Sequence, residues 1–78
     1  MHEKHPSLIK IGQRIREIRV AKGFSQENFA AEVGLDRTYI GGVERGERNI
    51  SVLNLLRIAK ALKVEVGELI PPIKQLKL

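Results

Sequence analysis

Small and apolar residues recur along residues 25–45 with the spacing of two short helices that pack on each other. The spacing places five side chains on the inward faces in a single register: Phe29, Val33, Leu35, Ile40 and Val43. Gly34 stands between the two patterns and suits the end of the first helix, because glycine adopts the left-handed conformation at least cost. Asp36 follows and can accept hydrogen bonds from the free N–H groups of the next helix. Ser25 is placed to cap the first helix, so the stretch predicts helices over 26–33 and 37–45, joined by a tight turn.

The pattern also predicts how the two helices cross. Ala30 is small where two steeply crossing helices must bring their backbones close together. The inward positions leave four residues of the second helix facing outward: Arg37, Thr38, Gly41 and Gly42. An ordinary pair of short amphipathic helices would share the apolar spacing. A small residue, a glycine and a cap in one register are typical of a helix-turn-helix, which we predict at about residues 25–45.

Gly41 and Gly42 are unusual inside a predicted helix, where each glycine costs about 0.5–1 kcal/mol relative to alanine. Close approach of the helix backbone to DNA, or to a neighbouring helix, would offset that cost. The alternative is that this helix is simply short and weak.

Three further helices are predicted around this pair. An amphipathic stripe with Ser7 as its cap predicts a helix over 8–22: Leu8, Ile11, Ile15 and Ile18. A broad apolar face after Ser51 predicts a helix as far as about residue 63: Val52, Leu55, Leu56, Ile58, Ala59 and Leu62. Residues 65–70 are expected to form a short fifth helix, which Pro71 and Pro72 stop. The predicted fold class is all-α.

With 78 residues, the chain has room for one small domain. We expect a flexible N-terminus over 1–6, a helix-turn-helix domain with its dimerisation helices over 7–71, and a C-terminal tail over 72–78. The tail alternates apolar and basic residues, so it either packs on a partner subunit or is loosely ordered.

The charge of the chain favours a polyanionic partner. Its 14 Lys and Arg residues against 9 Asp and Glu give a formal net charge of +5 and a pI of about 10.0. Charge alone does not separate DNA, RNA and an acidic lipid surface, but the helix-turn-helix favours double-stranded DNA. Gln26, at a helix N-terminus, is placed to bind a phosphate. Arg14 and Arg19 on the first predicted helix are further candidates for phosphate contact.

Other kinds of chemistry find little support in the sequence. There is no cysteine, and His2 and His5 have no third ligand candidate near them, so we predict no metal. We find no paired carboxylates in a pocket-forming context and no glycine-rich phosphate loop, so we predict no cofactor and no enzymatic activity. A signal peptide's apolar run is missing, as is any run of about 18 apolar residues. We therefore expect a cytoplasmic protein with no membrane partner.

Residues 11–70 together resemble the XRE family, the phage-repressor-like helix-turn-helix proteins. Within this family, the segment LDRTYIGGVERGERNIS is similar to the recognition segment of the controller proteins of bacterial restriction-modification systems, whose pattern is LDRTYISGIERGxRNxS. The resemblance implies a five-helix phage-repressor-like bundle and a homodimer that binds a pseudo-palindromic operator. It also implies regulation of the protein's own gene and of an endonuclease gene.

The resemblance implies DNA-binding roles for seven residues: Gln26, Arg37, Thr38, Tyr39, Gly41, Arg48 and Asn49. Of these, Arg37 is expected to read bases in the major groove, and Thr38 to contact base or backbone. Tyr39 and Arg48 are expected to meet phosphates or nearby bases. Gly41 stands where the family pattern has a serine, so any contact made by that hydroxyl is absent here.

The surplus of apolar positions near the C-terminus predicts a dimer joined through the fourth and fifth helices. Four residues are the expected interface: Leu53, Val64, Val66 and Leu69. In an activator, Glu27 would be a candidate contact for RNA polymerase. The alternative function is a protein-binding module, such as an antitoxin or a coactivator, which would use the same apolar residues to hold another protein.

Overall fold

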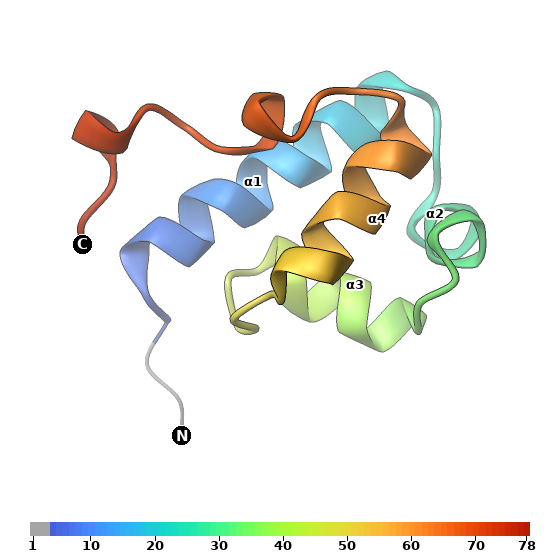
Figure 1. The fold of residues 1–78 in the computed structure, drawn as a ribbon. Helices are drawn as coiled ribbons and strands as arrows, with labels where there is room; N and C mark the ends of the chain where they lie inside the picture. Colours follow the sequence, from blue (N-terminus) through green and yellow to red (C-terminus); the bar gives the residue numbers. More distant parts are fainter. Residues whose placement is uncertain (1–3) are drawn as a thin grey trace.

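A computed structural model describes residues 4–78, and within this range the chain is helical and contains no strand. Four α-helices precede two short 3-10 helices (Figure 1). The α-helices are α1 (Pro6–Ala21), α2 (Gln26–Val33), α3 (Arg37–Glu44) and α4 (Val52–Leu62). The 3-10 helices are η1 (Val66–Leu69) and η2 (Ile73–Gln75). The predicted all-α class is confirmed, and the fifth helix is a 3-10 helix rather than an α-helix.

Local capping explains where α2, α3 and α4 begin and where α2 ends. The hydroxyls of Ser25 and Ser51 each accept a hydrogen bond from a backbone N–H three residues on, at 3.0 and 3.1 Å. Asp36 Oδ1 accepts from the Thr38 N–H at 2.7 Å. Gly34 ends α2 with a φ of 81°, in the left-handed region that favours glycine. All four roles agree with the sequence prediction.

The core lies where α1, α2, α3, α4 and η1 meet, and each of these elements contributes to it. Ten apolar side chains are buried there: Ile15, Ile18, Phe29, Ala30, Ile40, Val43, Ile58, Ala59, Leu62 and Leu69. Phe29, Ile40 and Val43 are thus inside, as predicted. Val33 and Leu35 pack half-buried at the edge of the core.

Two glycines allow α1 to lie directly against α3 and the turn that follows it. A Cβ on Gly12 would lie 2.7 Å from the Glu44 carbonyl oxygen. A Cβ on Gly46, whose φ is 77°, would lie 2.7 Å from Ile9 Cα. Since real Cβ atoms do not approach backbone atoms so closely, any larger residue would push α1 away from α3 and the turn that follows it.

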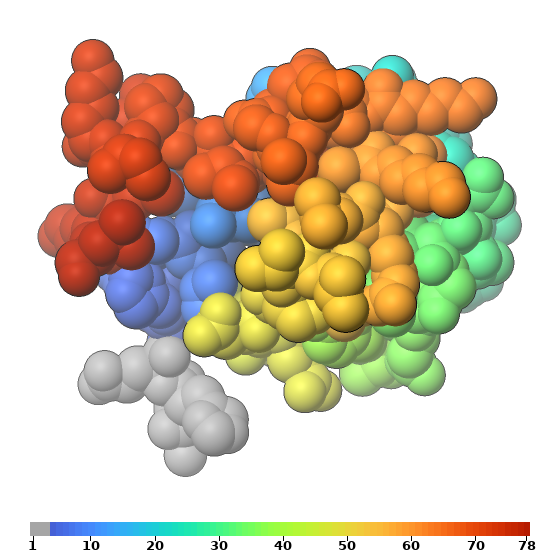
Figure 2. Space-filling model, viewed as in Figure 1, coloured from blue at the N-terminus to red at the C-terminus, as the bar shows by residue number. Residues whose placement is uncertain are grey.

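The Ser7 hydroxyl holds the C-terminal tail instead of capping α1. His5 is the cap, because its Nδ1 accepts a hydrogen bond from the Ser7 N–H at 3.1 Å. Ser7 Oγ donates to the Lys77 carbonyl at 2.8 Å and accepts from the Lys77 N–H at 2.9 Å. Lys10 Nζ donates to the Gln75 carbonyl at 2.7 Å. The tail therefore packs along α1 of its own chain (red beside blue in Figure 2), which is neither arrangement that we expected.

The first helix begins inside the stretch predicted as a flexible N-terminus. Residues 1–3, including His2, lie outside the described residues, and α1 starts at Pro6, the last residue of that predicted stretch. Among the helices of residues 4–78, none combines the length and the apolar character needed to cross a membrane.

Candidate nucleic-acid interface

Helix α3 lies along one edge of the molecule and packs against α1 and α2 (Figure 1). Ile40 and Val43 anchor α3 in the core, while Arg37 and Thr38 at its N-terminus are exposed. Its N-terminal residues are therefore presented to solvent on a helix whose other face is fixed.

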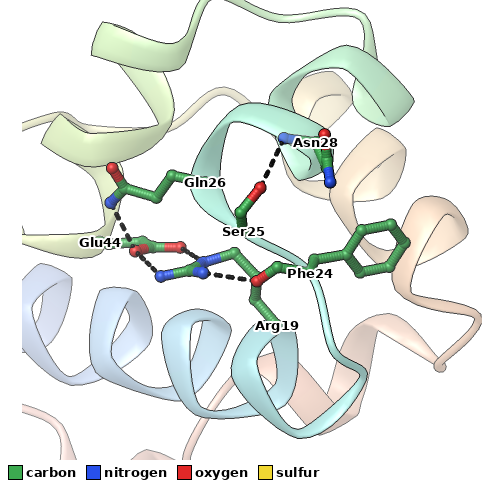
Figure 3. A network of polar contacts seen from close by, with 6 residues as sticks. All are labelled: Arg19, Phe24, Ser25, Gln26, Asn28 and Glu44. Atoms are coloured by element: carbon green, nitrogen blue, oxygen red, sulfur yellow. Dashed lines mark hydrogen bonds and ion pairs between the residues drawn. The ribbon is translucent and has the colours of Figure 1, made fainter.

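A buried polar network fixes that other face to α1 and α2 (Figure 3). Arg19 Nε donates to Glu44 Oε2 at 2.6 Å and Arg19 Nη2 to Glu44 Oε1 at 3.1 Å. These two side chains are 8% and 2% exposed. Arg19 Nη1 also donates to the Phe24 carbonyl at 2.8 Å, and Gln26 Nε2 donates to Glu44 Oε1 at 2.9 Å. A single carboxylate on α3 thus joins three helices and the turn that enters α2.

Hydrogen bonds within the fold involve the side chains of three predicted phosphate contacts, Arg19, Arg14 and Gln26. Arg19 is wrong as a candidate, because it is buried and bonded within the fold. Arg14 Nε donates to the Glu68 carbonyl at 2.9 Å, so this side chain holds α1 to η1. Gln26 donates to Glu44 in the free protein, so its predicted phosphate contact would require the amide to leave Glu44.

The other predicted contacts gather on α3 and the turn after it. Arg37 is 62% exposed, and its Nε lies 3.9 Å from Glu27 Oε1, beyond hydrogen-bond distance. Its guanidinium is therefore available to a base edge. Thr38, Arg48 and Asn49 are also exposed.

Tyr39 is half-buried and is held from two sides. Arg48 Cζ stands 5.7 Å from the centre of the Tyr39 ring, within the range of a cation–π interaction. The Tyr39 hydroxyl accepts a hydrogen bond from Asn54 Nδ2 at 3.3 Å. Arg57 Nη1 in turn donates to Asn54 Oδ1 at 2.7 Å. Asn54 was missed in the sequence, where its one signal is a polar residue within an apolar stretch of α4.

Gly41 and Gly42 lie on the outer side of α3 but are covered by side chains. A Cβ on Gly41 would lie 3.0 Å from Arg45 Nη1, and a Cβ on Gly42 would lie 3.0 Å from Arg48 Cγ. Both glycines are buried as a result. The nearest atoms belong to side chains, so close packing of a neighbouring helix backbone is not the reason for glycine at these two positions.

Arg45 also projects from the outer side of α3, and Glu47 occupies its hydrogen-bonding edge. Arg45 Nε donates to Glu47 Oε2 at 3.0 Å and Nη2 to Oε1 at 3.1 Å. The hydrogen bond from Arg45 lowers the pKa of Glu47 below its ordinary value, with smaller effects in the same direction from the charges of Arg45 and Lys4. Glu47 is therefore an ionised carboxylate at neutral pH, in the place where a phosphate or a guanine would meet Arg45.

The exposed Glu47 gives a testable prediction for DNA binding. The substitution Glu47→Gln should free Arg45 for a phosphate, raise operator affinity and steepen the plot of log K against log salt by about 0.9 per protomer. Mobility-shift titrations at several salt concentrations measure both quantities. If affinity and slope equal those of the wild type, Arg45 takes no part in binding.

The expected dimer residues fall into three environments. Leu53 is 63% exposed on α4, next to Val52 and Leu56, which are 72% and 46% exposed. Val64 and Val66 are half-buried and pack against the core. Leu69 is fully buried inside the protomer, so assigning it to an interface was wrong.

The chain has two capped helices joined by a tight turn, exposed arginines on the outer side of the second helix, and a net positive charge. These features define the class of DNA-binding helix-turn-helix proteins. The chain belongs to the helix-turn-helix family, whose model matches residues 15–69. The protein is a DNA-binding transcription regulator and not an enzyme.

Several relatives share most of their length with this chain. Control protein C.MunI from Mycoplasma is 40% identical over 86% of this chain and 92% of its own. Control protein C.BamHI from Bacillus amyloliquefaciens is 48% identical over 76% and 74%. Among solved structures, the restriction-modification controller protein C.AhdI from Aeromonas hydrophila has a TM-score of 0.78 and 60% identity, over 80% of this chain and 94% of that one.

Proposed function

We propose that this protein is a homodimeric controller protein of a restriction-modification system, which binds a pseudo-palindromic operator and regulates its own gene and an endonuclease gene. The observation that carries the proposal is the 60% identity to a restriction-modification controller protein over 94% of that protein's chain. The recognition segment supports it, because its arginines and Tyr39 lie together on α3 and the turn that follows. These relatives favour a gene regulator over an antitoxin or coactivator module.

In the proposed complex, α3 lies in the major groove. There Arg37 makes a bidentate pair with a guanine, which is worth about 1–3 kcal/mol of discrimination. Tyr39, Arg48 and the backbone at the start of α2 set the register on the phosphates. Two copies related by a two-fold axis meet half-sites about one turn of DNA apart. The exposed carboxylate of Glu27 is the proposed contact for RNA polymerase.

The proposed dimer face is the exposed apolar cluster of α4, formed by Val52, Leu53 and Leu56. Leu56 follows Val52 by four positions and Leu53 by three, so it is a neighbour of both on the helix surface. Helix α4 lies at the front of the space-filling view in Figure 2. A second copy is the occupant that would cover it, because the proposed pseudo-palindromic operator requires two recognition helices in a fixed arrangement.

Charging this face should weaken the dimer. We expect Leu53→Glu to raise the dimer dissociation constant at least about tenfold, because burying a carboxylate among apolar side chains is unfavourable. Sedimentation equilibrium measures the constant directly. Val20→Glu is the matched control, since it charges another exposed apolar residue, 57% exposed, on α1 instead of α4. A Leu53→Glu variant as fully dimeric as the wild type would contradict this interface.

The regulatory role is tested with reporter genes in cells. The promoters upstream of the protein's own gene and of the endonuclease gene are each joined to a reporter, and the protein is supplied from a second plasmid. The proposal expects the output of both promoters to change with the amount of protein. Two promoters that do not respond would overturn the restriction-modification role while leaving DNA binding to be tested separately.

A further inference from the structure

The two adjacent glycines of α3 have different neighbours. A Cβ on Gly41 would first meet the end of a side chain, Arg45 Nη1 at 3.0 Å. A Cβ on Gly42 would lie 3.0 Å from Arg48 Cγ and 3.4 Å from Arg48 Nε. A guanidinium end moves aside by a small rotation, whereas crowding at Cγ displaces the whole side chain. An added methyl group is therefore easily accepted at position 41, but at position 42 it moves Arg48.

Arg48 takes a defined position because it lies across Gly42. Its guanidinium carbon stands 5.7 Å from the centre of the Tyr39 ring. The ring itself is anchored, since the Tyr39 hydroxyl accepts a hydrogen bond from Asn54 Nδ2 at 3.3 Å. Arg48 belongs to the turn after α3, where an exposed arginine would otherwise sample many rotamers. The helix surface at Gly42 and the Tyr39 ring together limit that freedom.

We propose that Gly42 is a positioning residue for DNA recognition, because its missing Cβ lets the Arg48 side chain cross α3 and rest on Tyr39, ready to contact DNA. The inference rests on the proposed function, in which Arg48 contacts the operator. An arginine already held in one orientation loses less conformational entropy on binding than a free one. This gain in binding explains why a residue that weakens a helix stands in the middle of the recognition helix.

The first test compares two single substitutions. Gly42→Ala should weaken binding of the DNA upstream of the protein's own gene by about 2- to 12-fold per half-site, the cost of ordering one flexible side chain. Its melting temperature should equal or exceed that of the wild type, because alanine is the better helix former. Gly67→Ala, the matched control, adds the same methyl group in η1, where no described residue beyond the chain neighbours of Gly67 lies within 4 Å of it, and should leave affinity within about twofold. Weaker binding without lost stability separates positioning from a structural role.

The second test repeats Gly42→Ala in an Arg48→Ala background. If Gly42 acts through Arg48, the added methyl group has no further effect on affinity there. If α3 instead needs glycine to approach DNA closely, Gly42→Ala weakens binding equally in both backgrounds, and that result overturns the proposal. Unchanged affinity of the single Gly42→Ala variant also overturns it. If the wild-type protein itself fails to bind this DNA, the result contradicts the proposed function, on which the inference depends.

Discussion

Replacing Glu44 with glutamine should lower the free energy of unfolding by about 3–5 kcal/mol, because it leaves the buried Arg19 charge without its carboxylate partner. Glu44 is 2% exposed and accepts hydrogen bonds from both Arg19 and Gln26. Small domains have total stabilities of about 5–15 kcal/mol, so this variant should be close to unfolding at room temperature. Urea denaturation followed by circular dichroism measures the change.

Two further variants separate the buried charge from other causes. Glu47→Gln makes the same substitution in an exposed ion pair and should leave the unfolding midpoint nearly unchanged. Replacing Arg19 and Glu44 together with methionine should recover part of the stability lost in Glu44→Gln, since no charge is then left unpaired. If Glu44→Gln is as stable as the wild type, the network does not hold α3 in place.

Replacing Arg37 with alanine should weaken operator binding by about 1–3 kcal/mol per half-site and relax the sequence preference at one base pair. The guanidinium is 62% exposed at the start of α3, where a helix in the major groove directs its first residues to base edges. A panel of operators with single changed base pairs, titrated in mobility-shift assays, locates the affected position. At that position the variant should bind all four base pairs with similar affinity.

Arg16→Ala is the matched control for Arg37→Ala. It removes the same charge from an exposed position on α1, outside the helix-turn-helix. Its effect should be small and equal for all operators of the panel, as for a general electrostatic contribution. Equal effects of the two substitutions across the panel would mean that Arg37 does not read a base.

Sequence reasoning succeeded where local chemistry decides the structure. Ser25, Asp36 and Ser51 cap the helices that follow them, and Gly34 ends α2, because each role depends on backbone groups within a few residues. The apolar spacing likewise placed Phe29, Ile40 and Val43 in the core. These caps and core residues fix which side of α3 faces outward, and with it the position of the candidate DNA-binding surface.

The errors lie where residues far apart in the chain meet. Ser7 reads as a helix cap, but its hydroxyl bonds to Lys77 at the other end of the chain. Leu69 reads as a surplus apolar residue, but η1 folds back and buries it in the core. Such contacts depend on how whole elements pack, which spacing along the sequence does not specify.

Two further features were missed for the same reason. Gly12 gives no local turn signal, yet α1 and α3 touch at this residue. Arg19 looked like one of several exposed cations on α1, and its burial depends on a carboxylate 25 residues away. A polar or glycine residue inside an amphipathic pattern was the one available sign of each contact.

Whether α3 reads an operator in front of the protein's own gene is measured by a mobility-shift titration with that DNA. The titration is run at two salt concentrations and with an excess of nonspecific competitor. We expect saturable binding that survives the competitor, with one or two discrete complexes and a steep salt dependence. Binding that the competitor abolishes would contradict this expectation.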